Sequence, residues 1–341
     1  MHAARVIVIA LAIAGCSSSR AAAPESHADR AFYFWRSTLA LSATEKQALV
    51  DQHVNRLYVR AFDLGWNPEQ QRADVMGPLE IVDVPPIPTV PVVFIRQDVL
   101  AHMPASEIPA LAQRTWDTVV ERTRKLGAPT ELQLDCDWTD RSREAYFVFL
   151  REVKKVAHVP LSATIRLHQI KYRERTGVPP VERGMLMLYN MGEIAAGDDQ
   201  KAIFDAATTK KYIARLGEYP LPLDVALPIW SWTLHARDGA MVDLMQSTDP
   251  DELPALDFVR ATSRPTQYIV TRNAFLHGVL LREGDTLEIE RTTPTDTLAA
   301  AALVSPLLSP ARRSIALFDL SDRNLQRYPH DQLAAIFRSL R

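Results

Sequence analysis

Eight strand-like runs alternate with helix-like segments along the chain, and this alternation constrains the fold more than any other feature. The runs are rich in β-branched and aromatic residues, as is typical of strands in a parallel sheet. We expect these strands at 32–36, 57–63, 91–95, 131–138, 161–168, 184–190, 223–230 and 314–320. Eight such units within residues 31–341 favour an α/β fold of the (β/α)8 TIM-barrel type over a doubly wound sheet.

The helices between the strands carry clear signals. Ser42 and Glu45 form a capping box that predicts a helix through Val54. Apolar residues at helical spacing predict a second helix after the fourth strand, at Tyr146, Phe149, Leu150, Val153 and Ala157. The segment 331–340 supplies the last helix.

Two stretches exceed a minimal barrel. Residues 66–90, with prolines at 85, 86 and 88, predict a long loop after the second strand. Residues 236–310 contain β-like runs at 267–272 and 279–291, the latter with a Glu283-Gly284-Asp285 turn. We expect a small β-hairpin insertion there, between strands seven and eight. Both stretches would lie over the C-terminal mouth, where barrel enzymes keep their sites.

The N-terminus has the features of a targeting segment. A short positive stretch ending at Arg5 precedes an apolar run at 6–14 that is too short to span a bilayer. The run ends at Ala14-Gly15-Cys16, which resembles the lipobox of bacterial lipoproteins. That resemblance implies removal of residues 1–15, acylation of Cys16 including palmitate, and anchoring to a membrane. Ser17, where an aspartate would signal inner-membrane retention, implies the outer membrane of a Gram-negative cell.

The Ser-, Ala- and Pro-rich residues 16–30 predict a flexible tether. The chain has two cysteines, so lipidation of Cys16 leaves Cys136 without a partner. We expect Cys136 to be a buried, inert thiol.

The fourth strand carries the candidate chemistry. Its period-two pattern turns Leu132, Leu134 and Cys136 toward the helices and Gln133, Asp135 and Asp137 into the barrel. Two carboxylates inside a barrel are costly unless they are paired or functional. Inward partners are expected from strand five, namely Thr164, Arg166 and His168, and from Arg36 and Arg60 on strands one and two.

Residues Leu134-Asp135-Cys136-Asp137-Trp138 resemble the D-x-D-W part of the strand-four signature of family 18 glycoside hydrolases. Met187-Leu188-Tyr189-Asn190 is similar to the strand-six motif of that family. The resemblance implies a chitinase-like barrel in which Asp135, Asp137 and Tyr189 are catalytic, Tyr189 supporting the reacting N-acetyl group. The chain also resembles an uncharacterised group of bacterial lipoproteins, a likeness that implies no activity.

The sequence departs from the family signature at its acid. The signature's first Asp falls on Leu132 and its catalytic Glu on Thr139, and Phe94-Ile95-Arg96-Gln97 replaces a Gly-rich motif. Threonine has no titratable proton near neutral pH, so we expect no standard chitinase action. Thr139 and Asp140 are instead interpreted as a helix N-cap. Four other carboxylates remain as possible acids, at Asp63, Asp137, Glu193 and Asp319.

Aromatic and polar residues near the expected mouth favour a sugar ligand, because flat rings stack on pyranose faces while polar groups bind the hydroxyls. Trp35 is better interpreted as core. The residues that we expect to contact substrate are Arg60, Trp138, Arg166, His168, Asn190, Glu193, Trp230 and Trp232.

Other functional classes find little support. The net charge of −2, from 39 Lys and Arg against 41 Asp and Glu, argues against a nucleic-acid partner. Metalloprotease, Walker A, dinucleotide-binding and nucleophile-elbow motifs do not occur. Nine scattered histidines show no ligand spacing, so we expect neither a metal nor a cofactor.

Three hypotheses remain open. The protein is a divergent glycosidase, a catalytically silent carbohydrate-binding barrel, or a scaffold lipoprotein whose buried aspartates and arginines only hold the barrel together.

Overall fold

The computed structural model describes residues 28–189, 203–245, 248–309 and 313–340. Eight parallel strands close into a barrel in the order β1-β18-β10-β9-β8-β7-β6-β3, and β3 pairs with β1 to complete the ring. Every expected strand lies at one of these positions, so the predicted TIM barrel is confirmed. The strands are β1 (Asp29–Phe34), β3 (Arg56–Asn67), β6 (Thr89–Ile95), β7 (Leu132–Cys136), β8 (Leu161–Arg166), β9 (Arg183–Met187), β10 (Leu223–Pro228) and β18 (Ser314–Phe318).

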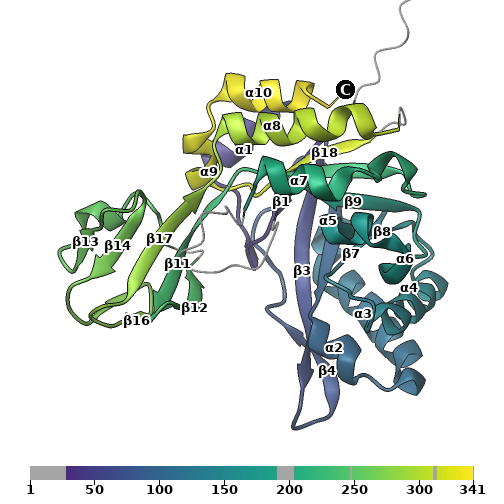
Figure 1. Cartoon of the computed structure of the whole chain (residues 1–341). Helices are drawn as coiled ribbons and strands as arrows, with labels where there is room; N and C mark the ends of the chain where they lie inside the picture. The colour runs from purple at the N-terminus through teal and green to yellow at the C-terminus, as the bar shows by residue number, and fades with distance from the viewer. Residues whose placement is uncertain (1–27, 190–202, 246–247, 310–312, 341) are drawn as a thin grey trace, which may run out of the picture.

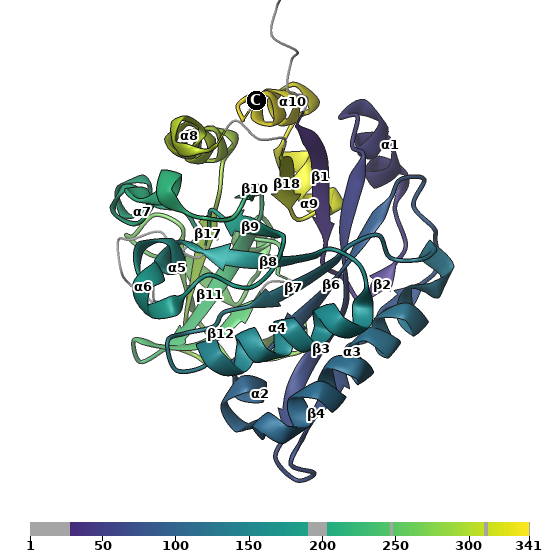
Figure 2. The ribbon, with the colours of Figure 1, turned by 90° about the vertical axis from the view of Figure 1, so that its right-hand side faces the viewer.

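Helices cover the outside of the barrel (Figures 1 and 2). They are α1 (Ala43–Asp51), α2 (Gln97–His102), α3 (Ile108–Thr123), α4 (Arg143–Ala157), α5 (Leu167–Lys171), α6 (Arg173–Thr176), α7 (Ala206–Ile213), α8 (Pro294–Val304), α9 (Asp322–Arg327) and α10 (His330–Arg338). The Ser42 capping box is present as predicted. The predicted N-cap at Thr139 is wrong, because α4 begins after Ser142, whose Oγ accepts the Thr139 N–H at 3.0 Å.

The second unit has no helix among the described residues between β3 and β6. The long loop expected at 66–90 is instead a β arm: β3 continues to Asn67 and pairs with antiparallel β4 (Arg72–Met76). Further on, β5 (Glu80–Ile81) pairs with β2 (Thr38–Leu39). Prolines within residues 68–88 lack the N–H that a helix interior needs, which accounts for the missing helix.

The insertion after β10 is larger than the small hairpin that the sequence predicted. It contains a five-stranded antiparallel sheet in the order β12-β11-β17-β14-β13 and a separate β15–β16 hairpin, and Figure 1 shows it projecting from the barrel. Residues 294–304 form barrel helix α8 and do not belong to it. Its strands are β11 (Ser231–Arg237), β12 (Ala240–Met245), β13 (Val259–Ala261), β14 (Gln267–Val270), β15 (Ala274–Leu276), β16 (Val279–Leu281) and β17 (Thr286–Arg291).

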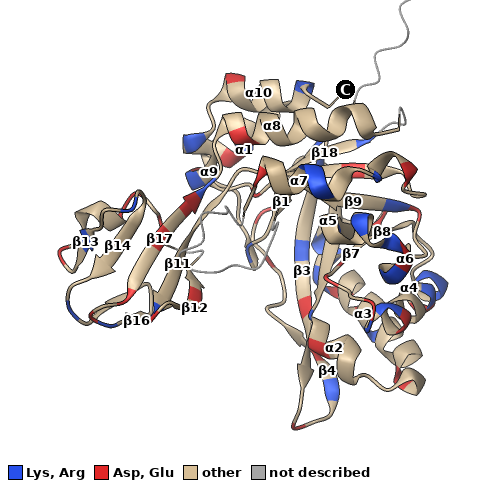
Figure 3. Ribbon diagram, viewed as in Figure 1, with Lys and Arg blue, Asp and Glu red and all other residues tan. Residues whose placement is uncertain are grey.

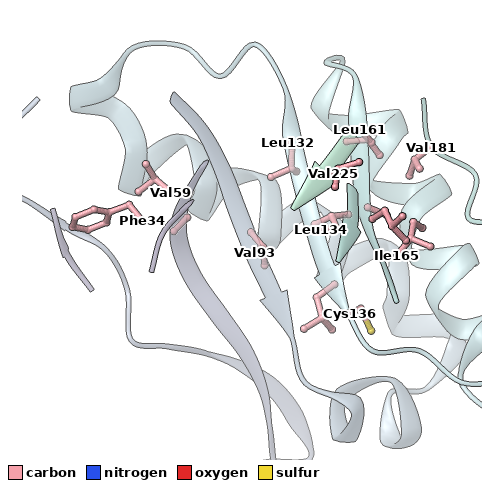
Figure 4. Packing of buried hydrophobic residues seen from close by; sticks show 14 of the residues in the cluster. Phe34, Val59, Val93, Leu132, Leu134, Cys136, Leu161, Ile165, Val181 and Val225 are labelled. Atoms are coloured by element: carbon pink, nitrogen blue, oxygen red, sulfur yellow. The ribbon is translucent and has the colours of Figure 1, made fainter. Parts of the chain in front are cut away.

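Two apolar layers line the barrel wall. Leu132, Leu134 and Cys136 lie in the outer layer between strands and helices, as the alternation predicted (Figure 4). The inner layer fills the barrel and includes Tyr33 and Tyr58, whose rings stack at 4.9 Å.

Cys136 is buried, and this burial raises the pKa of its thiol well above its usual value. No helix in the described ranges has both the length and the apolar character needed to cross a membrane.

Candidate functional site

The C-terminal ends of neighbouring strands β7 and β8 bring two aspartates and an arginine together inside the barrel mouth. Arg166 Nε donates to Asp137 Oδ1, and Arg166 Nη2 lies 3.7 Å from Asp135 Oδ1. Thr164 Oγ1 donates to the same Asp135 oxygen at 2.6 Å. The expectation that strands four and five supply one charged cluster is therefore met by the geometry.

The members of this cluster differ in their contact with water. Asp135 is 4% exposed, and the Asp137 side chain is 40% exposed. Burial raises the pKa of Asp135, although Arg166 opposes the shift. Burial lowers the pKa of Arg166, but Asp137 and Asp135 outweigh that effect and raise it above its usual value. Asp137 is thus the carboxylate of the pair that a ligand can reach.

Arg166 keeps one donor unused. Its Nη1 is buried and has no hydrogen-bond partner among the described residues, while Nε and Nη2 face the two aspartates. The Arg166 Cζ also lies 5.8 Å from the centre of the Tyr189 ring. A buried donor without a partner is costly, so this nitrogen marks a position where a ligand oxygen would be stabilised.

Aromatic rings from separate strands surround the cluster. Tyr189 meets Trp230 edge to face at 4.6 Å, and Phe318 lies 5.2 Å from Trp230 and 5.3 Å from Trp35. The Tyr189 hydroxyl donates to Met187 Sδ at 3.0 Å. This hydroxyl is therefore directed toward its own strand, and the ring is the part of Tyr189 that borders Arg166.

The insertion contributes to the same aromatic layer. Trp232 on β11 is buried beside Trp230, with ring centres 6.1 Å apart. The Trp232 Nε1–H donates to Glu290 Oε2 at 2.7 Å, and Glu290 lies opposite Trp232 on β17. The base of the insertion is thus part of the wall of the mouth.

Trp138 does not belong to the mouth. It is fully buried in the outer layer, stacks on Tyr146 at 5.2 Å and donates its indole N–H to the Thr176 carbonyl at 2.9 Å. The proposed sugar-stacking role of Trp138 is therefore wrong. The alternation that directs Leu132, Leu134 and Cys136 outward also directs Trp138 outward, one position beyond the strand.

Two arginines expected near the centre are engaged elsewhere. Arg60 donates to both oxygens of Asp63, at 2.7 and 2.6 Å, where the β3–β4 arm begins. Arg36 pairs with Glu45 at 2.7 Å. Asp63 is thus held in an ion pair with Arg60.

His168 and His235 lie in different parts of the fold. His168 lies in the first turn of α5, where burial lowers its pKa and nearby Asp137 opposes the shift. His235 is buried in the insertion and bonds Asp285 at 2.7 Å. Within the described ranges, no three His, Cys, Asp or Glu side chains are grouped so as to hold a metal ion.

Thr139, where the resemblance places the acid of the signature, lies between β7 and α4. Asp319, one of the alternative acids, directly follows β18. Burial raises the pKa of Asp319 to about 6, although Arg36 and Asn324 oppose the shift. Asn324 Nδ2 donates to Asp319 Oδ1 at 2.5 Å. Cys16, Asn190 and Glu193 lie outside the described residues.

Two contributors to the mouth went unnoticed in the sequence. Phe318 touches four aromatic rings, and the period-two pattern of the eighth strand places it on the inner face with Ala316. Gln97, at the start of α2, donates to the Asp137 carbonyl at 2.6 Å. Only the barrel's closure brings Gln97 to Asp137, so no local sequence signal indicates it.

The described residues thus form a (β/α)8 barrel with an insertion after the seventh strand and carboxylates at its mouth. The spore cortex-lytic enzyme SleL of Bacillus cereus superposes with a TM-score of 0.52 at 14% identity, covering 92% of this chain and 74% of that one. A chitinase from Chromobacterium violaceum gives 0.51 at 13% identity, covering 92% and 98%. No protein-family model and no curated protein matches the sequence. At such identities the likeness shows the shared fold.

Proposed function

We propose that the protein is a lipid-anchored component of the cell envelope, on the outer membrane of a Gram-negative bacterium, whose barrel mouth binds a glycan without cleaving it. The lipobox-like segment ending at Cys16 supports the anchor and the location. The structural neighbours, a chitinase and a spore cortex-lytic enzyme, support a glycan as the ligand class.

The ion-pair cluster of Asp135, Asp137 and Arg166 carries the proposal. Cleavage of a glycosidic bond needs a group that protonates the leaving oxygen. Here Arg166 neutralises the two strand-four aspartates, and Thr139 occupies the position of the acid. What remains is a binding surface: the exposed Asp137 oxygen, the unused Arg166 Nη1 and a ring of aromatic side chains.

Hydrolysis is the second candidate, because of Asp319. Its pKa of about 6 leaves a substantial protonated fraction near neutral pH, as a general acid requires. Asp319 follows Phe318, which packs on Tyr189 and Trp230 at the centre of the mouth.

One experiment separates the two candidates. The purified full chain in detergent is mixed with chito-oligosaccharides and peptidoglycan fragments, binding is measured by calorimetry, and products are read by mass spectrometry. We expect binding with intact glycans. Asp137→Asn should weaken binding by at least about tenfold, because a hydrogen bond to a charged group contributes about 1.5–3 kcal/mol.

The control is Asp331→Asn on α10, which removes the same charge from an exposed position outside the mouth. New fragments that disappear in Asp319→Asn would establish the hydrolase. Absence of both binding and cleavage with these glycans would overturn both candidates.

A further inference from the structure

A cluster of cations and tyrosines on the outside of the barrel is not explained by the mouth. Lys171 ends α5, Tyr172 follows it, Arg175 lies on α6, and Tyr212 lies on α7, which packs against α5. Figure 3 shows these neighbouring helices carrying Lys and Arg. We call these four residues the basic-aromatic patch.

The rings and cations of the patch contact one another. Lys171 Nζ lies 4.5 Å from the centre of the Tyr212 ring and 5.1 Å from that of Tyr172, and Arg175 Cζ lies 5.0 Å from the latter. The two rings meet edge to face at 6.4 Å. These contacts hold the side chains in a defined arrangement.

The positive charge of the patch is not neutralised. Neither of its two cations, Lys171 and Arg175, forms an ion pair with a carboxylate in the described part of the chain. Arg173 and Arg215 beside them, in contrast, pair with Glu174 and Glu218. The whole chain has a net charge of −2. The patch is therefore a local excess of positive charge that the overall composition does not account for.

The patch also offers an apolar surface. Tyr172 is 37% exposed beside the two cations above its face. A sugar ring can pack against the exposed part of Tyr172 while its carboxylate or phosphate pairs with the cations, so the two features together fit an acidic sugar better than a neutral one.

Helix α5 links the patch to the mouth. It begins after Arg166, the residue between the two aspartates, and ends at Lys171. Five helical residues span about 7.5 Å along the axis, roughly the length of one or two sugar units. A glycan that leaves the mouth over α5 therefore meets the patch.

We propose that the basic-aromatic patch binds an anionic polysaccharide, with acidic groups repeated along its chain, as an extension of the glycan held in the mouth. This proposal rests on the proposed function in one respect, namely that a single polymer occupies both the mouth and the patch. The two places are probed separately below.

The test uses the full chain in detergent and a matched pair of polymers, polygalacturonate and its methyl ester. We expect the wild-type chain to bind polygalacturonate more tightly than the ester, and more weakly as the salt concentration rises. Lys171→Gln/Arg175→Gln should reduce the affinity for polygalacturonate about tenfold, two exposed charge pairs being lost. Arg124→Gln/Arg338→Gln removes two exposed cations elsewhere and should behave as wild type.

The outcomes separate the two proposals. Equal affinity for both polymers, or no difference between the patch variant and its control, overturns the patch. If chito-oligosaccharides still bind in a manner sensitive to Asp137→Asn, the proposed function survives that result. Binding of polygalacturonate that depends on the patch, without any binding at the mouth, overturns the proposed function and leaves the patch as an independent site.

Discussion

At the scale of single residues, Arg166 holds the mouth together. It compensates two carboxylates at once, one of them almost fully buried. We expect Arg166→Met to lower the free energy of unfolding by about 3–5 kcal/mol, because it leaves buried charge uncompensated. Urea denaturation measures this change.

Two comparisons check the origin of that loss. Adding Asp135→Asn to Arg166→Met should restore a large part of the stability, since it removes the charge left without a partner. Arg151→Met, which breaks an exposed pair with Glu144, should cost less than about 1 kcal/mol. Equal losses in the two single variants would contradict the buried-pair account.

Asp224, at the opposite end of the barrel, gives the protein a pH dependence. Burial raises its pKa to about 6, with Arg183 opposing the shift. In the unfolded chain the pKa is about 3.9. The native state thus binds the proton more tightly, and the resulting stability is present below about pH 4 and is lost as the pH rises to about 6.

The stability of wild type relative to Asp224→Asn should therefore fall by about 2 kcal/mol between pH 4 and pH 7, which is most of the change expected at about 1.4 kcal/mol for each unit of pKa shift. Unfolding by urea at several pH values measures this difference. Asp257→Asn, which removes a carboxylate exposed on the insertion, serves as the control for charge alone. A difference independent of pH would contradict the assignment.

The sequence predicted the direction of single side chains correctly where the two-residue period of a strand was followed. The alternation on strand four correctly placed Asp135 inside and Cys136 outside, because a strand leaves its side chains only two directions. The same alternation directs Trp138 outward, so the prediction that its indole contacts a sugar was inconsistent with the pattern. Contacts such as Gln97 to the Asp137 carbonyl depend on which loops the closed barrel brings together, and no local pattern encodes them.

At the scale of elements, the packing of β9 between β8 and β10 depends on a residue without a side chain. A Cβ at Gly184 would lie 2.8 Å from Ile165 Cγ1 and 2.8 Å from Leu223 Cδ2. Gly184→Ala should destabilise the protein by about 1–3 kcal/mol through overpacking. Thermal and urea unfolding measure the loss.

A double-mutant cycle tests the cause. Leu223→Ala removes one of the two clashing atoms, so Gly184→Ala/Leu223→Ala should cost less than the sum of the single variants. Additive losses would place the strain elsewhere.

The elements themselves were partly predictable. Eight strands and the Ser42 capping box follow from local patterns. The β arm after β3 and the five-stranded insertion do not, because their pairings join segments separated in the sequence and their short strands lack a long period. The size of the insertion was underestimated for the same reason.

At the scale of the whole molecule, the proposed lipid anchor can be tested at Cys16. The described structure begins at residue 28, after the expected lipidation site. Cys16→Ser should abolish incorporation of labelled palmitate and move the protein out of the membrane fraction, with an unchanged melting temperature. Labelling or membrane retention equal to wild type would contradict a lipid on Cys16.

The way the insertion joins the barrel has an evolutionary consequence. Its first and last residues, Ser231 and Arg291, lie opposite each other on paired strands. The chain therefore leaves and re-enters the barrel at a single point. A whole insertion can for this reason be gained, shortened or exchanged while the order of the barrel strands stays the same. Because Trp232 at its base packs beside Trp230, each such exchange would also reshape the mouth. Descendants of this barrel can thus acquire a mouth of different shape in one genetic step while the eight strands stay the same.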